Sequence, residues 1–275
     1  MKKALVVYNP VSGSKKWRDV PALIQETLRE HHFDWTWYDT KPQQNLEPLF
    51  TADYDRVVVS GGDGTVAEVV KCMVQRKVKT PLVVLPQGSG NLLARALGIP
   101  VLQPRRALAM GLTEKPQRLD VMRVNNRYYG VIAVGRGYDT FLMQETSRSL
   151  KRKLGPFAYF WTFLKTVLFY RSKPYKLTLD NRRVQVLARF IMVFNLLPVP
   201  LTPVHPADGL LNTLVLTSRG RIQNFTSRTV VIKGKKELKF QVDGDVFRSK
   251  VIRVEVLPKA LSIVFKTKLL ENSGF

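Results

Sequence analysis

The sequence is poor in cysteine and histidine and contains no long apolar run. Its one cysteine, Cys72, cannot form an internal disulfide or a thiolate metal cluster, which indicates a reducing compartment or a fold that needs no such links. We expect Cys72 to be a buried structural thiol. We expect the adjacent His31 and His32 to be surface residues, because a histidine pair without acidic or cysteine partners rarely forms a site.

No segment reaches the roughly 18–20 apolar residues that a membrane-spanning helix needs. The nearest candidate, residues 157–170, is interrupted by Lys165. The first ten residues lack the apolar stretch and cleavage site of a secretion signal, so we expect them to form a first strand. These absences predict a cytoplasmic protein that crosses no membrane.

Acidic residues are also scarce, with 21 Asp and Glu against 44 Lys and Arg and a formal net charge of +23. Such a balance requires a negatively charged partner, which could be nucleic acid, an anionic bilayer or a polyphosphate substrate. Charge alone does not choose among them. The 45% hydrophobic and 24% charged residues are ordinary globular values and exclude a disordered or fibrous chain.

The first hundred residues repeat one pattern three times: an apolar run, a turn-rich loop and an amphipathic helical stretch. The apolar runs are Ala4–Tyr8, Val57–Ser60 and Leu82–Leu85. This pattern predicts an α/β N-terminal domain, residues 1–118, with a parallel sheet and glycine-rich loops. Ligands of such sheets bind at the carboxyl ends of the strands, where these loops lie.

After Arg118, short apolar runs separated by turns dominate, which predicts an antiparallel β-rich second domain, residues 119–265. The tail 266–275 could complete the first domain. The one long helical candidate is Gln144–Tyr170. We expect the active-site cleft to lie between the two domains.

Glycine at a strand-to-helix turn lets backbone N–H groups approach an anion, and the helix N-terminus adds a favourable dipole. The three loops therefore predict phosphate binding. The P-loop motif is absent, the Gly88-x-Gly90 pair lacks the third glycine and the acid of a dinucleotide fingerprint, and the protein-kinase signatures are missing.

Three ordered motifs resemble the diacylglycerol kinase catalytic-domain family, which includes bacterial lipid kinases and sphingosine kinases. They are Asn9-Pro10-Val11-Ser12-Gly13, Ser60-Gly61-Gly62-Asp63-Gly64-Thr65 with Glu68, and Pro86-Gln87-Gly88-Ser89-Gly90-Asn91 with Ala94-Arg95-x-Leu97-Gly98. The resemblance extends more weakly over the whole chain.

The resemblance implies an ATP- and Mg²⁺-dependent lipid kinase, and it implies which residues contact the nucleotide. These are Asn9, Pro10, Ser12, Gly13, Thr40, Gly61, Gly62, Asp63, Gly64, Thr65, Glu68, Gly88, Ser89, Gly90 and Asn91. Because a carboxylate in a phosphate-binding loop would repel ATP without a cation, Asp63 predicts magnesium. The alternative is that Asp63 caps the helix that begins near Thr65, with Glu68 completing the cap or helping to hold the metal shell.

In the second domain, Gln241-Val242-Asp243-Gly244-Asp245 resembles the family's Gln-x-Asp-Gly-Glu, whose acids are assigned to the general base and its surroundings. Either Asp243 or Asp245 would take the proton of the lipid hydroxyl. Asp-Gly between apolar runs is also a strong hairpin signal, and the two interpretations are compatible.

Two further segments resemble family sites. By this resemblance a structural Mg²⁺ would be held by Asp208 with His205 and Leu210, although Ala207 and Asn212 replace two of the family's acids. Asp139, in Gly135-Arg136-Gly137-Tyr138-Asp139, would orient the acceptor lipid or stabilise a turn.

The stretch from Arg148 to Arg189 has Asp180 as its only acid and interleaves basic with aromatic residues. Such a surface favours peripheral contact with an anionic membrane, although the aromatic residues could instead form a core. The expected partners are therefore ATP, a lipid substrate and an anionic membrane. Nucleic acid is not expected, and a homodimer is left open.

Two alternatives to a lipid kinase remain at this point. An NAD kinase-like phosphotransferase would share the Gly-Gly-Asp-Gly-Thr loop, but residues 9–13 and 88–98 resemble the lipid branch. A non-catalytic protein that binds anionic membrane or nucleic acid would account for the net charge of +23.

Overall fold

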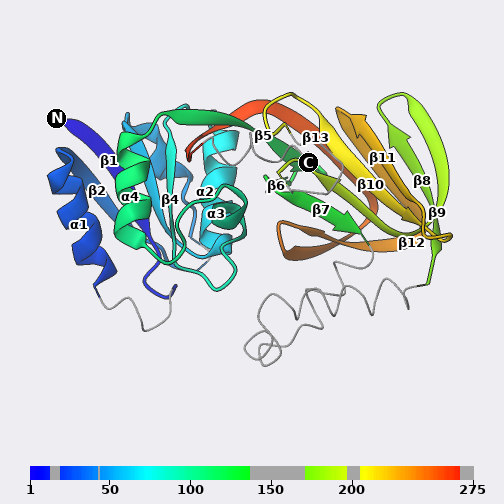
Figure 1. Ribbon diagram of the computed structural model, residues 1–275, viewed down its shortest axis with the longest axis horizontal. Helices are drawn as coiled ribbons and strands as arrows, with labels where there is room; N and C mark the ends of the chain where they lie inside the picture. Colours follow the sequence, from blue (N-terminus) through cyan, green and yellow to red (C-terminus); the bar gives the residue numbers. More distant parts are fainter. Residues whose placement is uncertain (13–18, 43, 137–170, 197–204, 267–275) are drawn as a thin grey trace. The chain divides into compact units, whose positions relative to one another are not determined.

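The computed structural model describes residues 1–12, 19–42, 44–136, 171–196 and 205–266 (Figure 1). These residues fall into two compact units. The first unit comprises residues 1–121, 205–207 and 258–266, and the second comprises residues 122–196 and 208–257. The predicted candidate helix at Gln144–Tyr170, Gly13, Asp139 and the tail 267–275 lie outside the described residues.

The first unit alternates strands and helices around a parallel sheet. Its elements are β1 (Lys2–Tyr8), α1 (Val20–Glu30), β2 (Phe33–Asp39), the 3₁₀ helix η1 (Glu47–Thr51), β3 (Arg56–Gly61), α2 (Asp63–Gln75), β4 (Leu82–Pro86), α3 (Leu92–Ala96), α4 (Pro104–Thr113) and the start of β5 (Pro116–Val124). The strand order is β2-β1-β3-β4, and all three pairs are parallel. The continuous apolar runs of β1, β3 and β4 are buried, whereas Lys2 and Lys3 at the start of β1 are exposed.

The helices of this unit present apolar faces to the sheet and to one another. In α1, Val20, Ile24 and Leu28 are buried at helical spacing. Figure 1 shows α1 beside α4, and α4 packs on β4. Cys72 of α2 is buried, as predicted, and burial raises the pKa of its thiol to about 11, so it remains protonated at neutral pH.

The last strand among the described residues, β13 (Asp245–Val264), contributes to both units. Its final part adds to the first sheet, where Ile263 pairs in parallel with Leu82 of β4. The sequence predicts a second domain that extends to residue 265, but residues 258–266 belong to the first unit because of this strand addition.

The described part of the second unit consists of antiparallel strands, which confirms the predicted β-rich second part. They are β6 (Tyr128–Gly130), β7 (Ala133–Arg136), β8 (Lys173–Leu179), β9 (Arg182–Phe194), β10 (Leu211–Thr217), β11 (Ile222–Ser227), β12 (Thr229–Val242) and β13. The order is β11-β10-β9-β7-β12-β13, and β8 pairs with both β9 and β12. Alternate residues such as Ile191, Val193, Ile232 and Phe240 form its core.

Among the described residues, none of the helices is long and apolar enough to span a bilayer.

Candidate active site

The parallel register brings three loops to the same edge of the first sheet. Tyr8 at the end of β1 pairs with Ser60 of β3, and Gly61 at the end of β3 pairs with Pro86 of β4. The segments that follow these strands begin at Asn9, Gly62 and Gln87, so the predicted nucleotide residues of all three motifs start side by side.

Hydrogen bonds join the first loop to the second. The Asn9 backbone N–H donates to the Ser60 carbonyl at 2.9 Å, and Asn9 Nδ2 donates to Thr65 Oγ1 at 2.8 Å. The Ser12 hydroxyl oxygen accepts the Gly62 N–H at 3.3 Å. Asn9 and Ser12 therefore hold the first loop against the start of α2.

The second and third loops approach so closely that glycine is required. A Cβ on Gly88 would stand 2.8 Å from the Cα of Gly62, closer than real Cβ atoms come to another backbone. A Cβ on Gly90 would stand 2.7 Å from Oδ2 of Asp63. These glycines serve the contact between loops in addition to any approach to an anion.

Asp63 connects the same two loops through its carboxylate. Its Oδ2 accepts the N–H of Asn91 at 2.8 Å, and its Oδ1 accepts the N–H of Leu92 at 2.5 Å. Asp63 thus caps α3, which follows the third loop. The alternative prediction that Asp63 caps its own helix α2 is wrong, because α2 has Gly62 as its N-cap and no side-chain cap hydrogen bond.

Asn91 stabilises the third loop from within. It has a left-handed backbone, with φ 50° and ψ 48°. Its side-chain oxygen accepts the Gly88 N–H at 2.8 Å, and its Nδ2 donates to the Gly88 carbonyl at 2.6 Å. The loop is therefore held in one shape by its own asparagine and by Asp63.

The first turn of α2 has the features of an anion-binding helix N-terminus. Its N-terminal N–H groups have no capping side chain within the described residues, and Gly64 has no neighbour within 4 Å of an ideal Cβ. Backbone N–H groups and the helix dipole favour a phosphate there. Tyr8, at the end of β1, adds no charge, because burial and then the nearby Asp39 raise the pKa of its hydroxyl.

Thr40 and Glu68 were also predicted at this site. Thr40 follows β2, and its N–H donates to the Tyr8 carbonyl at 2.8 Å, which places its backbone at the same sheet edge. Glu68 pairs with Lys71 at 3.1 Å, half-exposed on α2, and does not complete a cap. The role of Glu68 in a metal shell stays a prediction.

Sequence reasoning missed two residues of this edge as site residues. Gln87 is buried and its Nε2 donates to the Ser60 hydroxyl, which ties the ends of β3 and β4 together. Arg95 Nε donates to the Gly90 carbonyl at 2.8 Å and places a cation beside the third loop. The signal for Gln87 was a polar side chain directly after an apolar strand.

The residues present fit a magnesium ion that is held mainly by phosphate oxygens and water. Asp63 is the only acid in the three loop sequences, and its carboxylate is already oriented by two N–H donors. Mg²⁺ commonly takes one or two carboxylates together with substrate phosphates. An all-protein cage does not fit, since no three His, Cys, Asp or Glu side chains cluster as metal ligands in the part of the chain that the structure describes.

In the second unit, Asp243 and Gly244 form a two-residue hairpin turn, as predicted from Asp-Gly, and Asp245 directly follows the turn. Asp243 and Gly244 both have positive φ, at 45° and 105°, and Val242 pairs with Asp245. The Asp243 carboxylate accepts three backbone N–H groups, from Val131 at 2.6 Å, Ile132 at 3.0 Å and Ala133 at 2.8 Å. Asp243 therefore holds the bend between β6 and β7, whereas the side chain of Asp245 is exposed.

The predicted structural metal site is not seen as a cluster. The Asp208 carboxylate accepts the Leu210 N–H at 2.9 Å in a local turn, and His205 is exposed. The metal-binding roles of Asp208, His205 and Leu210 stay predictions.

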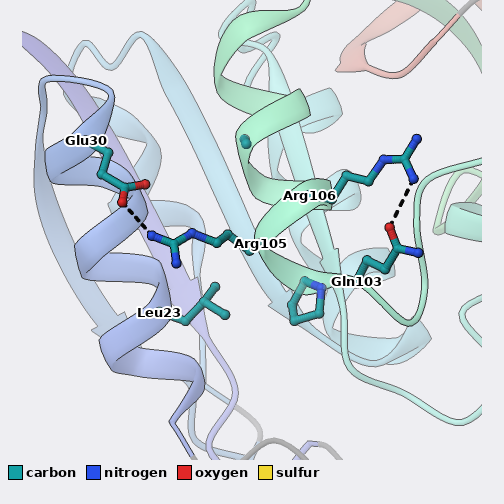
Figure 2. Close-up of a pocket in the computed structure, with 7 residues that line it drawn as sticks. Leu23, Glu30, Gln103, Arg105 and Arg106 are labelled. Atoms are coloured by element: carbon teal, nitrogen blue, oxygen red, sulfur yellow. Dashed lines mark hydrogen bonds and ion pairs between the residues drawn. The ribbon is translucent and has the colours of Figure 1, made fainter.

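An open apolar groove of about 600 Å³ lies elsewhere in the first unit, between α1 and α4. Figure 2 shows Leu23 of α1 facing α4, with Arg105 of α4 reaching Glu30 of α1. The predicted nucleotide residues do not line this groove. The loop edge, and not the groove, is therefore the candidate active site.

Comparison with known proteins identifies a family that matches the part of the chain that contains the three loops. Residues 3–124 match the family model described as diacylglycerol kinase catalytic domain. This part of the chain is similar to that family. The match includes all three loops and confirms the predicted resemblance.

Curated relatives that this part of the chain matches carry the corresponding names. A Pseudomonas aeruginosa protein named "Probable lipid kinase YegS-like" is 34% identical over 163 residues, which cover 59% of this chain and 53% of the relative. A Staphylococcus aureus protein named diacylglycerol kinase is 34% identical over 165 residues, 58% of this chain and 51% of the relative. The chain thus spans about half the length of the curated relatives it matches.

The fold likeness extends further than the sequence likeness. The crystal structure of a diacylglycerol kinase from Bacillus anthracis superposes with a TM-score of 0.81 over 98% of both chains, at 22% identity. This likeness shows that the two-part fold, including the β-rich second unit, is shared with that kinase.

Proposed function

We propose that the chain transfers the γ-phosphoryl group of ATP to a hydroxyl of a membrane lipid, diacylglycerol or a related lipid. The observation that carries the proposal is the hydrogen-bonded junction of three loops at one sheet edge, within the part that matches the kinase family. The loops provide uncapped N–H groups, glycine backbones and one oriented carboxylate, which is the set that phosphate binding needs.

In this proposal the first unit binds the phosphates of ATP. The first turn of α2 and the backbone of residues 88–90 hold the phosphate oxygens by N–H groups, and Asn9, Ser12 and Asn91 keep the loops in the bound shape. Magnesium at Asp63 would neutralise phosphate charge. Anchoring of the loops before ATP arrives lowers the ordering cost of binding.

The transfer itself exchanges one oxygen for another at phosphorus. The lipid hydroxyl oxygen forms a bond to the γ-phosphorus, the bond from that phosphorus to the β–γ bridging oxygen breaks, and ADP leaves. The hydroxyl proton must go to a base. We assign this role to Asp245, because the carboxylate of Asp243 is already engaged by three N–H donors of the turn that it holds.

Asp245 can be tested against Asp243 by substitution. We expect Asp245→Asn to lower kcat by about 10²–10⁴-fold with little change in the KM for ATP, since a general base contributes on that order. Asp245→Glu should restore much of the rate, because the family pattern has Glu at this position. Asp243→Asn should instead lower the free energy of unfolding. Equal rates for wild type and Asp245→Asn would remove Asp245 from the mechanism.

The activity is tested with radiolabelled ATP and a panel of acceptors: diacylglycerol, phosphatidylglycerol, a sphingoid base and a prenol in mixed micelles, and NAD in solution. The proposal predicts label on one or more lipids. Label on NAD alone would establish the NAD kinase-like alternative. No label on any acceptor, with the protein shown to be folded, would contradict the proposal.

A further inference from the structure

One end of the second unit combines exposed apolar side chains with arginines. Among the described residues, Leu187 and Ile222 are two of only five large apolar residues with exposed side chains, at 50% and 67% exposure. Leu187 lies on β9 and Ile222 begins β11, and Figure 1 shows both strands beside β10.

The sheet register places Leu187 and Ile222 on the same face. On β9, Leu187 directly precedes Ala188. Ile222 of β11 pairs with Leu216 of β10, which directly follows Val215. Ala188 and Val215 both point into the core of the second unit. Because side chains alternate along a strand, Leu187 and Ile222 both point away from that core.

Three arginines accompany these two residues. Arg219 and Arg221 lie in and after the turn between β10 and β11, and the described residues provide neither with an ion pair. Arg189 follows Ala188 and its Nη2 donates to the Ser218 carbonyl at 3.2 Å. We call Leu187, Arg189, Arg219, Arg221 and Ile222 the hairpin patch.

The β10–β11 hairpin, which carries Arg219, Arg221 and Ile222 of the patch, is held in one conformation. The Thr217 N–H donates to the Arg221 carbonyl at 2.9 Å, and Thr217 Oγ1 accepts the Arg221 N–H at 3.1 Å. Gly220 has φ 74°, a value that favours glycine, and its N–H donates to the Thr217 carbonyl. A fixed turn presents Arg219 and Arg221 with little entropy to lose on binding.

We propose that the hairpin patch docks the chain on an anionic lipid bilayer, with Leu187 and Ile222 entering the interface and the arginines contacting the head groups. The choice of a bilayer rests on the proposed function, because a lipid kinase must reach its substrate there. The described part of the second unit contains 19 Lys and Arg against 6 Asp and Glu, so it attracts an anionic surface and repels a second copy of itself.

The combination of charge and apolar surface indicates which partner the hairpin patch binds. The arginines would contact the phosphates of a nucleic acid, but an exposed leucine and isoleucine would add little to its binding. A bilayer interface uses both, since apolar side chains insert and each basic residue adds electrostatic attraction to anionic lipids. The patch therefore fits a bilayer better than a polynucleotide.

The test is co-sedimentation of the whole protein with vesicles of equal parts phosphatidylglycerol and phosphatidylcholine, compared with phosphatidylcholine alone. We expect Arg219→Gln with Arg221→Gln to reduce the partition coefficient on anionic vesicles by about 10-fold or more, because each basic residue near the surface contributes several-fold. Ile222→Ser should reduce it several-fold, on the order expected for losing one inserted aliphatic side chain.

Matched control variants remove arginine or leucine side chains that lie outside the hairpin patch. Arg183→Gln with Arg253→Gln removes two exposed arginines of the same unit, and Arg183 lies about 17 Å along β9 from Ala188. This double variant should reduce the partition coefficient on anionic vesicles by less than about 3-fold. Leu102→Ser removes a side chain that is 78% exposed in the first unit and should have no effect. Thermal unfolding of each variant shows that it is folded.

Several results would overturn the proposal. Equal losses in the two arginine double variants would mean that only overall charge matters. If the patch variants lose binding to duplex DNA but retain vesicle binding, the patch is a nucleic-acid site. If Ile222→Ser converts a dimer to a monomer, the patch contacts a second copy of the chain. Phosphorylation of a short-chain diacylglycerol dispersed below its micelle concentration needs no bilayer and separates the two proposals. The patch variants should phosphorylate it at the wild-type rate. If the wild-type protein does not phosphorylate it, the kinase proposal itself fails.

Discussion

Asp63 shows how a residue can be found by sequence and still have an unforeseen structural role. The motif identifies Asp63 as the informative acid, and the structure places it at the start of α2, as its position after two glycines suggests. Its hydrogen bonds to Asn91 and Leu92 join residues 28 and 29 positions apart. No local pattern predicts such a contact, because it depends on the adjacency of β3 and β4 in the sheet.

Cys72 and Asp243 show which structural roles a local sequence pattern predicts and which it does not. Cys72 is a buried thiol as predicted, because an apolar helix face is readable from sequence. Asp243 was predicted in a hairpin turn, and the Asp-Gly pair confirms that local rule. Its three N–H donors come from more than one hundred residues earlier in the chain, at Val131, Ile132 and Ala133, and could not be foreseen.

At the residue scale we predict that Asp63→Ala destabilises the fold. The sequence alone suggests loss of turnover with an intact fold, but the structure shows that this change also removes the acceptor of two N–H groups. We expect the free energy of unfolding in urea to fall by about 1–3 kcal/mol. Glu68→Ala, which removes an exposed partner of Lys71, should cost less than about 1 kcal/mol. Equal unfolding midpoints for Asp63→Ala and wild type would show that the carboxylate does not anchor α3.

At the scale of elements, the sequence predicts most of the first unit. Apolar runs of four or five residues identify β1, β3 and β4 because both faces of these strands are buried, and the glycine-rich loops mark where they end. Helix α2 begins two residues earlier than its apolar periodicity indicates, since Asp63 and Gly64 form its first turn. The contribution of β13 to the first sheet was missed, because strand partners distant in sequence leave no local signal.

The contact between the second and third loops leads to a prediction at this scale. Gly88→Ala places a methyl group 2.8 Å from the Gly62 Cα, so one loop must move. We expect the free energy of unfolding to fall by about 1–3 kcal/mol, measured by urea denaturation.

Gly64→Ala is the matched control for Gly88→Ala. Its added Cβ meets no atom within 4 Å, and alanine favours a helix over glycine, so stability should stay unchanged or rise by up to about 1 kcal/mol. If both variants unfold at the same urea concentration as wild type, the close approach of the loops is not required for the fold.

At the scale of the whole molecule, the sequence predicts a two-part chain with a β-rich second part, and the shared fold of the Bacillus anthracis kinase confirms it. The net charge of +23 requires an anionic partner, but only the structure shows that exposed apolar residues of β9 and β11 accompany arginines on one face of the second unit. Composition reports total charge, and register determines which side chains share a face.

The proposed kinase activity requires three loops to act together on one nucleotide. Hydrogen exchange followed by mass spectrometry, with and without ATP and magnesium, reports on all three in a single experiment. We predict slower exchange together in peptides that contain residues 9–12, 60–65 and 86–91, with η1 and the groove between α1 and α4 unchanged. Protection of one loop alone, of the groove instead, or of no segment would contradict the account.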